Sequence, residues 1–580
     1  MNKVIAFLIL FLPLKQFAQT PDFAAAQKFD AHHLQKQVTR LQIIPFFLKK
    51  SNKFWFTVDQ KVEGNKFDYY LVDLKTKQKT PLFDKDLITS GLKVLDPTAP
   101  KNAMVSYSSQ FSKDESTVEI SYNHLKYDYN FNTKALVKQA TKPVREAPRA
   151  IGDWSPNQKW VLFALNHNLY LKSAGDTAAI KLSADGALYF SFSLTEGYDF
   201  TDKPTATDAV WSADSQNFYV LRKDSRKVKT MAVINSIVKP RPVVTSYKYE
   251  LPDDKEVPQY EFYVGSVTDH NLKKVNIERW PDQEVVVLHQ QNIGNEVFLL
   301  RKKRSRDEIE LCAVDLKTGN LRVVVNEVSK PFINPDLFNV SILNKGSDIL
   351  WWSDRTGWGH YYHYNDSGKL LNTITEGNWT AGKVSAIDTA KRLIYFYGYG
   401  KEVGRNPNYA FVYQKSMDGN KPPLLLTPED ANHNVFISPT KNYFVDNFSR
   451  IDLAPKTVVR DNLGKFIADV YEPDLKKLYD YGWKQPEQFK VKAKDGVTDL
   501  YGLMWKPFNF DPNKKYPIIS QVYPGPFTET VWNDFTITDR YNNTSLAQVG
   551  FIVVVMGHRG GSPYRNASYY KYGHQNLRDY

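Results

Sequence analysis

Trp154-Ser155-Pro156-Asn157-Gln158-Lys159-Trp160, followed by Val161-Leu162-Phe163-Ala164, is the stretch of sequence that decides the fold class. It pairs a polar turn with a short apolar run, which is typical of a turn entering a buried strand. Related pieces recur at residues 211–217 and 437–442, with a weaker copy at 111–114. Recurrence of one supersecondary unit along a chain indicates a repeat architecture.

Hydrophobic and polar residues alternate with period two from about residue 45 to residue 475, which predicts strands throughout. A turn joining two antiparallel strands, completed by two more strands, gives a four-stranded sheet that cannot bury both of its faces alone. Radial stacking of such sheets buries them, and a spacing of about 40–50 residues per unit predicts roughly eight units. We therefore expect a β-propeller of about eight blades over residues 45–475. A set of unrelated β-sandwiches is the alternative.

Composition and charge narrow the class of protein. The chain has 580 residues, of which 42% are hydrophobic and 14% aromatic, so we expect at least two domains and no global disorder. The formal net charge is +13, but basic residues are scattered. The densest basic run, residues 301–306, is followed at once by Asp307 and Glu308, which indicates the end of a hairpin. We expect no nucleic-acid partner.

The N-terminus has the order of a secretory signal peptide. A short charged start precedes an apolar run from Val4 to Leu14, and small Ala18 is a plausible last residue, so we assign residues 1–18 to the signal. The run is too short to span a bilayer, although an N-terminal anchor is the alternative. Residues 19–44 are expected to be helical. The signal predicts export, to the periplasm or the exterior. The only cysteine is Cys312, which excludes an internal disulfide and fits a bacterial periplasm better than an animal cell surface.

Residues 485–580 follow a different pattern. Residues 489–493 and 500–505 predict a hairpin, and the short apolar runs 518–523 and 551–556 predict buried parallel strands. A polar, partly helical segment separates these two runs. An α/β sheet begins in this way.

Several motifs resemble the prolyl oligopeptidase family, specifically its dipeptidyl peptidase IV-like branch. They are Gln521-Val522-Tyr523-Pro524-Gly525-Pro526, residues 553–562, Arg222–Val228, Val257–Glu261 and Ser353–His360. The resemblance covers essentially the whole chain after the signal. It implies a propeller followed by an α/β-hydrolase domain over residues 485–580, and a serine peptidase that cleaves short peptides after Pro or sometimes Ala. It also implies that the Tyr523 hydroxyl belongs to the oxyanion hole, where a donor stabilises the negative charge of a tetrahedral intermediate.

The nucleophile of such an enzyme is a serine in a Gly-x-Ser-x-Gly elbow. The 580 residues contain no such motif, and the nearest match, Gly560-Gly561-Ser562-Pro563-Tyr564, lacks the closing glycine. The resemblance implies that Ser, Asp and His of the triad lie beyond Tyr580. We therefore expect an incomplete hydrolase domain, inactive as this chain alone, with an unpaired apolar sheet edge.

The acids that would bind a substrate's free amine are less well defined. The enzyme after which the branch is named has a glutamate pair before a Trp-Ser-Pro turn. Here residues 196–202 hold no such pair, and Glu196, Asp199 or Asp202 are the candidates to replace it. The number of residues released is therefore open.

The sequence predicts no cofactor and no metal site, because it has no His-Glu-x-x-His, Cys-pair or phosphate-loop motif. The expected partners are peptide substrates, with a homodimer possible in the full-length form, and no stable membrane anchor. The alternative function is a non-catalytic propeller that binds peptides or a protein.

Overall fold

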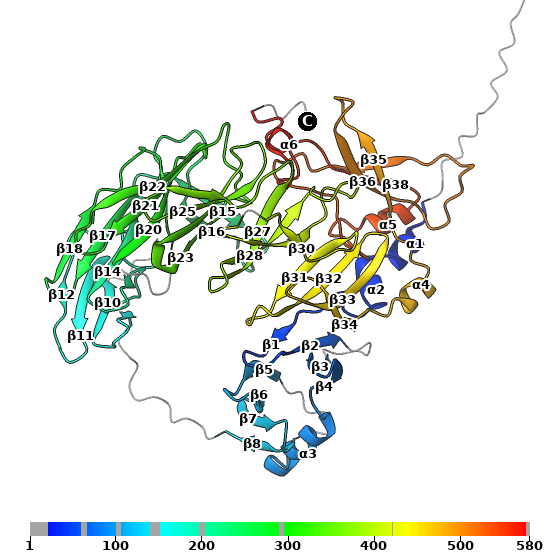
Figure 1. Cartoon of the computed structure of the whole chain (residues 1–580), viewed down its shortest axis with the longest axis horizontal. Coiled ribbons are helices and arrows are strands. Elements are labelled where there is room, and N and C mark those ends of the chain that lie inside the picture. The colour runs from blue at the N-terminus through cyan, green and yellow to red at the C-terminus, as the bar shows by residue number, and fades with distance from the viewer. Residues whose placement is uncertain are drawn as a thin grey trace, which may run out of the picture.

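The computed structural model describes residues 21–59, 67–99, 106–139, 151–194, 197, 203–288, 295–419 and 421–575. The predicted signal peptide and the candidate acids Glu196, Asp199 and Asp202 lie outside these residues. The described chain consists mostly of β-strands (Figure 1).

Eight four-stranded antiparallel sheets follow one another between Phe46 and Tyr471, and we number them sheets 1–8 in chain order. Sheets 1–4 are β1 (Phe46–Phe47), β2 (Lys53–Asp59), β3 (Phe67–Asp73) and β4 (Gln78–Pro81); β5 (Ser106–Phe111), β6 (Thr117–Tyr122), β7 (Leu125–Asn130) and β8 (Leu136–Lys138); β9 (Asp153–Trp154), β10 (Trp160–Leu165), β11 (Asn168–Ser173) and β12 (Ile180–Lys181); β13 (Val210–Trp211), β14 (Asn217–Asp224), β17 (Gln259–Ser266) and β18 (Asn271–Val275). Sheets 5–8 are β19 (Glu284–Leu288), β20 (Glu296–Lys302), β21 (Glu308–Asp315) and β22 (Leu321–Val328); β23 (Val340–Leu343), β24 (Asp348–Ser353), β25 (His360–Asn365) and β26 (Leu370–Thr373); β27 (Thr380–Asp388), β28 (Leu393–Tyr399), β29 (Phe411–Ser416) and β30 (Leu424–Leu425); β31 (Asn432–Ile437), β32 (Tyr443–Arg450), β33 (Leu453–Asp461) and β34 (Phe466–Tyr471).

The repeated turn joins the first two strands of a sheet. In sheet 3, the Ser155 hydroxyl accepts a hydrogen bond from the Trp160 backbone N–H at 3.0 Å, and Gln158 has a left-handed φ of 62°. Sheet 4 repeats this arrangement, with Ser212 accepting from Asn217 N–H at 3.0 Å. A serine whose hydroxyl satisfies the backbone fixes the turn, which explains why this residue type recurs.

Apolar side chains join most neighbouring sheets. Seven buried clusters each combine residues of two adjacent sheets. They join sheet 1 to sheet 2, sheet 3 to 4, 4 to 5, 5 to 6, 6 to 7, 7 to 8, and sheet 8 to sheet 1. Among the described residues, no such cluster joins sheet 2 to sheet 3. Figure 1 shows β5–β8 and β9–β12 apart from each other. The eight sheets therefore form an open ring that is packed at seven junctions, with its gap between sheets 2 and 3.

Sheets 1 and 8 meet although they lie at opposite ends of this region. Within the described chain no strand of sheet 1 pairs with a strand of sheet 8, so side-chain packing closes this junction, with Phe54, Tyr443 and Val445 at its centre. Polar contacts reinforce it: the Tyr443 hydroxyl donates to the Lys53 carbonyl at 3.2 Å, and the Lys79 ammonium donates to the Val470 carbonyl at 3.0 Å.

The C-terminal sheet has the strand order β35 (Glu487–Lys492), β36 (Asp499–Trp505), β38 (Ile552–Met556) and β37 (Ile518–Gln521). The predicted hairpin is confirmed as antiparallel β35 and β36, and the predicted parallel pair is confirmed as β37 and β38. Helix α5 (Asn543–Gln548) precedes β38, so the pair has the form of a βαβ unit. Strand β37 is the outer strand on one side, and Ile518 is 66% exposed there.

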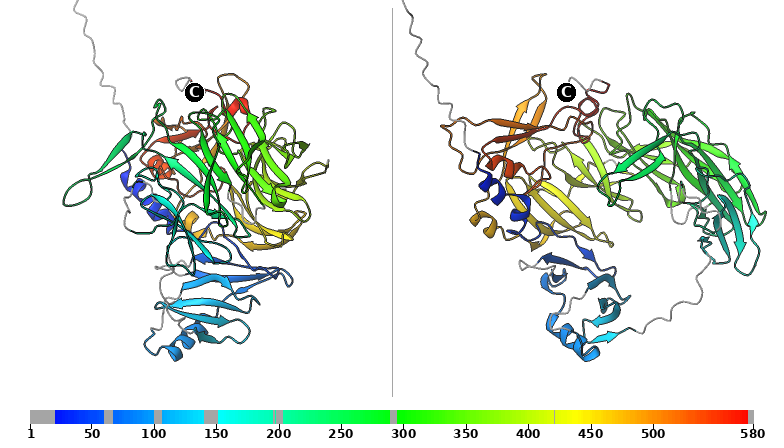
Figure 2. Two further views of the ribbon diagram at one scale, coloured as in Figure 1. Left: turned by 90° about the vertical axis from the view of Figure 1, so that its left-hand side faces the viewer. Right: turned by 180° about the vertical axis from the view of Figure 1, so that it is seen from behind.

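The remaining elements are short. They are α1 (Phe23–Lys28), α2 (Ala31–Gln35), α3 (Lys85–Leu95), α4 (Lys476–Asp480), α6 (Ala567–Tyr570), the 3-10 turn η1 (Asn344–Gly346) and the hairpin β15 (Thr230–Asn235) and β16 (Val243–Lys248). Helices α1 and α2 pack on α4 and on the C-terminal part through Phe29, Leu34 and Phe535. The β15–β16 hairpin, inserted in sheet 4, extends away from the sheets (Figure 2). No helix in the described part of the chain is long and apolar enough to cross a membrane.

Phe54→Ala tests the closure of sheet 1 on sheet 8. Phe54 is fully buried in the cluster that joins them. Its truncation leaves a cavity and should lower the free energy of unfolding by about 3–5 kcal/mol, measured by urea denaturation. Val94→Ala on α3, where the side chain is 82% exposed, is the control and should change it by less than about 0.5 kcal/mol. If both variants changed the free energy of unfolding equally, side-chain packing between sheets 1 and 8 would be contradicted.

Candidate active site

Tyr523 lies two residues after the end of strand β37 and begins the Tyr523-Pro524-Gly525-Pro526 turn. Its side chain is 45% exposed, so the phenol is accessible and not turned into the core. The ring lies against Gly525, where a Cβ atom would be 2.7 Å from Tyr523 Cε1. Only glycine leaves room for the ring in this position. The local sequence therefore holds the phenol at the carboxyl end of a strand of a parallel pair, where α/β folds place ligands and reacting groups.

Two hydrogen bonds lie behind this turn. The His558 ring donates a hydrogen bond to the Gly525 carbonyl, while burial lowers its pKa. Phe527, which has a left-handed φ of 59°, donates its N–H to the Gly560 carbonyl at 3.0 Å. These contacts fasten the Tyr523 turn to the segment that follows β38.

Glu529 is a half-buried acid in the same region. Its carboxylate accepts the Val531 N–H at 3.2 Å and lies against Gly557, where a Cβ would be 3.0 Å from both carboxylate oxygens. Burial raises the pKa of Glu529 to about 7, and the positive charge of Arg565 opposes this rise. Near neutral pH the carboxyl is therefore ionised in only part of the molecules.

Ser562, the serine of the nearest nucleophile-like sequence, is fully buried. Its hydroxyl has no hydrogen-bond partner among the described residues. A nucleophile must be reached by substrate, so Ser562 does not serve as one in this arrangement.

Loops of sheets 5–7 hold the segment after β38. The Asp354 carboxylate accepts the Ser329 hydroxyl at 2.7 Å, pairs with Lys571 at 2.8 Å and accepts the Tyr570 hydroxyl. Tyr564 stacks on Tyr399 with ring centroids 4.3 Å apart. The sheets thus fix the polypeptide that carries Ser562 and α6.

Arg222 brings together two of the motifs on which the resemblance rests. Its guanidinium is buried, binds both Asp185 oxygens at 2.8–2.9 Å and pairs with Glu261. The guanidinium carbon also lies 3.5 Å from the centre of the Phe190 ring. A buried arginine with two carboxylates and an aromatic face is well satisfied, so it fixes the geometry of sheet 4.

Glu429, His433 and Asp446 form a cluster with the spacing of a possible metal site. However, Arg460 donates to both Asp446 and Glu429, and the His433 ring contacts the Asp446 carboxylate at 2.9 Å and the Glu429 carbonyl at 3.0 Å. Most of the possible ligand atoms are therefore already used, although Glu429 Oε2 has no hydrogen-bond partner among the described residues. We assign the cluster as an ion-pair network of sheet 8.

The basic run that could have suggested a nucleic-acid site is the β20–β21 turn. Arg301 pairs with buried Glu310, and Arg306 with Glu284 at 2.8 Å. These arginines are engaged within sheet 5.

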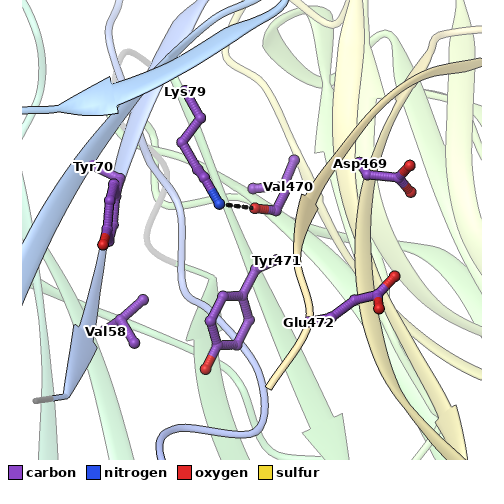
Figure 3. A pocket seen from close by; sticks show the side chains of 7 residues that line it. All are labelled: Val58, Tyr70, Lys79, Asp469, Val470, Tyr471 and Glu472. Atoms are coloured by element: carbon purple, nitrogen blue, oxygen red, sulfur yellow. Dashed lines mark hydrogen bonds between the residues drawn. The ribbon is translucent and has the colours of Figure 1, made fainter. Parts of the chain in front are cut away.

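A cavity of about 370 Å³ lies where sheet 1 meets sheet 8 (Figure 3). Lys79 extends between Tyr70 and Tyr471 and donates to Val470, while Asp469 and Glu472 lie at its margin and pair with Lys456. Lys79 and both acids already have partners within the protein. We therefore assign the cavity to the packing between sheets 1 and 8 and not to a ligand site.

Comparison with known proteins identifies the family. A model of the "Dipeptidyl peptidase IV (DPP IV) N-terminal region" matches residues 101–455. The chain belongs to the dipeptidyl peptidase IV-like branch of the prolyl oligopeptidase family. The resemblance found in the sequence is thus confirmed.

Individual relatives are distant. A probable dipeptidyl-aminopeptidase B of Metarhizium robertsii is 22% identical over 455 residues, covering 71% of this chain and 47% of the relative. Dipeptidyl peptidase 4 of Trichophyton tonsurans is 22% identical over 439 residues, covering 71% of this chain and 55% of the relative. The crystal structure of Porphyromonas gingivalis dipeptidyl peptidase 4 matches with a TM-score of 0.62 at 17% identity, covering 92% of this chain and 73% of that one. The chain spans about half the length of the curated relatives it matches.

Sequence reasoning found Tyr523 but missed Glu529, His558 and Arg565. His558 lies inside the 553–562 motif used for the resemblance, and Glu529 lies three residues after the 521–526 motif. A polar residue shortly after a strand, as His558 is after β38, was the available signal.

The pH dependence of stability tests the burial of Glu529. Because the folded pKa of about 7 exceeds the unfolded value of 4.5, the folded state holds this proton more tightly. The free energy of unfolding should therefore fall as pH rises from 4.5 to 7, by about 2–3 kcal/mol from this group. Glu529→Gln should remove that decrease, measured by urea denaturation at pH 5 and pH 8. Glu278→Gln, at an exposed position, is the control and should keep the decrease. If the free energy of unfolding of Glu529→Gln still fell with pH as in the parent protein, the burial of Glu529 would be refuted.

Proposed function

We propose that this chain carries the propeller and the first part of the hydrolase domain of a serine-type peptidase that acts on short peptides. The observation that carries the proposal is the accessible Tyr523 phenol at the carboxyl end of β37, backed by the fixed Gly525 turn. In this proposal the phenol donates to the oxyanion of the acyl intermediate, together with one backbone N–H. The family membership supports a dipeptidyl peptidase, because the relatives bear that name.

Finer features belong to the same proposal. Sheets 1–8 would be the eight blades that surround the site and admit only short peptides, and cleavage would follow Pro or sometimes Ala. The acid that binds the free amine would be Glu196, Asp199 or Asp202. The apolar N-terminal run supports export to the periplasm or the exterior. The attacking serine is not among these 580 residues, which contain no Gly-x-Ser-x-Gly.

The second candidate is a non-catalytic propeller that binds peptides or a protein, and it is favoured if the complete gene product holds no Gly-x-Ser-x-Gly. A fluorophosphonate probe separates the two, because it reacts only with a serine activated by an assembled triad.

Labelling of the native gene product, purified from its host, is the test. We expect one labelled serine in a Gly-x-Ser-x-Gly sequence. Tyr523→Phe should lower kcat by about 10²–10³-fold, since it removes one oxyanion donor. Tyr541→Phe, which changes a nearby tyrosine that is 39% exposed, should leave kcat unchanged. A folded product that takes up no probe would exclude the peptidase and leave the peptide-binding propeller.

We also propose that two copies associate through the β15–β16 hairpin. Its two strands pair only with each other, and its exposed side chains include Ile234 at 64%, Ile237 at 85% and Val244 at 59%. Unpaired strand edges with apolar side chains invite pairing with another chain.

Light scattering coupled to size exclusion tests the association. The protein should have the mass of a dimer, and Ile234→Lys together with Val244→Lys should yield the monomer by placing charges in the contact. Val94→Lys on exposed α3 is the matched control and should remain dimeric. A monomeric parent protein at micromolar concentration would rule out the hairpin contact.

A further inference from the structure

A cavity of about 560 Å³ lies between the β35–β36 turn and the segment after β38, with Pro407 from the loop before β29 on one side. Its walls include Asp495, Tyr501, Arg559, Arg565, Tyr569 and Tyr572. Volumes of this size hold small ligands in other proteins. We call it the arginine pocket.

Two arginine–tyrosine stacks form part of the wall. The Arg559 guanidinium carbon lies 3.6 Å from the centre of the Tyr572 ring, and that of Arg565 lies 4.4 Å from the centre of the Tyr569 ring. Stacking on an aromatic face fixes the plane of a guanidinium and so directs its N–H groups. The two cationic side chains are therefore held in fixed orientations.

The two acids of the pocket, Asp495 and Asp499, form their ion pairs with residues other than Arg565. Asp495 accepts from the Thr498 hydroxyl at 2.6 Å and from Arg559 at 2.9 Å. The first of these contacts contributes most to lowering its pKa to about 2. Asp499 pairs with Lys492 at 2.6 Å and with Lys490 at 3.4 Å. Both carboxylates are thus neutralised by other groups.

Arg565 keeps unused hydrogen-bonding capacity. Its buried Nη1 has no hydrogen-bond partner among the described residues. Glu529 is the acid whose charge interacts with Arg565, but burial holds its pKa near 7, so it compensates the guanidinium only in part. An incompletely compensated guanidinium beside a cavity is a site for an anion.

We propose that the arginine pocket binds the C-terminal carboxylate of a short peptide, with Arg565 as the principal cation. A guanidinium presents two parallel N–H groups, which match the two oxygens of a carboxylate. The tyrosine rings and Pro407 supply apolar surface for the adjoining residue, and the volume admits one or two residues. The choice of a peptide over other carboxylates rests on the proposed function, whose substrates and products carry such a terminus.

Calorimetry on the 580-residue chain tests this with acetyl-Ala-Ala as the free acid, the same compound as its C-terminal amide, and inorganic phosphate. The acid should bind at least tenfold more tightly than the amide, since the amide lacks the charge. Arg565→Gln should weaken binding of the acid at least tenfold. Arg565→Lys, which keeps the charge but not the planar fork, should restore part of the loss. A thermal melt establishes that each variant is folded.

Arg322→Gln is the matched control, because Arg322 is an ion-paired surface arginine of sheet 5 outside the pocket. It should bind the acid like the parent chain. Equal binding of acid and amide, full binding by Arg565→Gln, or binding of phosphate without the acid would each overturn the assignment. The test needs no nucleophile, so it succeeds or fails separately from fluorophosphonate labelling.

Discussion

Sheets 1 and 4–8 have buried apolar clusters on both faces, and the whole structure depends on neighbouring sheets covering these faces. Burial of side chains such as Trp351 and Trp352, which are fully inaccessible, is possible only because sheets 5 and 7 flank sheet 6 on both sides. At roughly 25 cal/mol per Å² of apolar area, such contacts outweigh any hydrogen bond between the sheets. The junction of sheets 2 and 3 lacks a buried cluster in the described chain, so the ring depends on its other seven contacts.

The closure of sheet 1 on sheet 8 has a consequence for the candidate site. It brings the N-terminal helices beside α4 and the C-terminal part, where Phe29 and Leu34 pack with Phe535. Asp534, next to Phe535, accepts hydrogen bonds from Asn432 and Ser449 of sheet 8. The sheet that bears Tyr523 is therefore held by both ends of the ring and, through Asp354, by the loop after β24 in sheet 6.

Local features of this fold follow from the sequence, whereas the contacts between distant segments do not. The Ser155 turn, the β35–β36 hairpin and the parallel β37–β38 pair are set by residues close together in the chain, and all were predictable. Tyr523 was found only through resemblance, because an isolated tyrosine after a strand has no specific signal. The unusual state of Glu529 results from burial against Gly557 and from Arg565, and no local pattern encodes those contacts. The hairpin β15–β16 alternates like any other strand pair, so its projection from sheet 4 was equally hidden.

Strand β37 connects the apolar edge of the C-terminal sheet with the chemistry proposed for it. Its outer side has no partner strand among the described residues, and Ile518 and Val522 are 66% and 71% exposed. A further parallel strand on that edge would satisfy the free backbone groups of β37 and add side chains beside Ile518 and Val522. Its carboxyl end would then lie beside Tyr523, because parallel strands end at the same edge of a sheet. The exposed apolar side chains of β37 and the accessible phenol of Tyr523 thus lie on, or just after, the same outer strand of the C-terminal sheet.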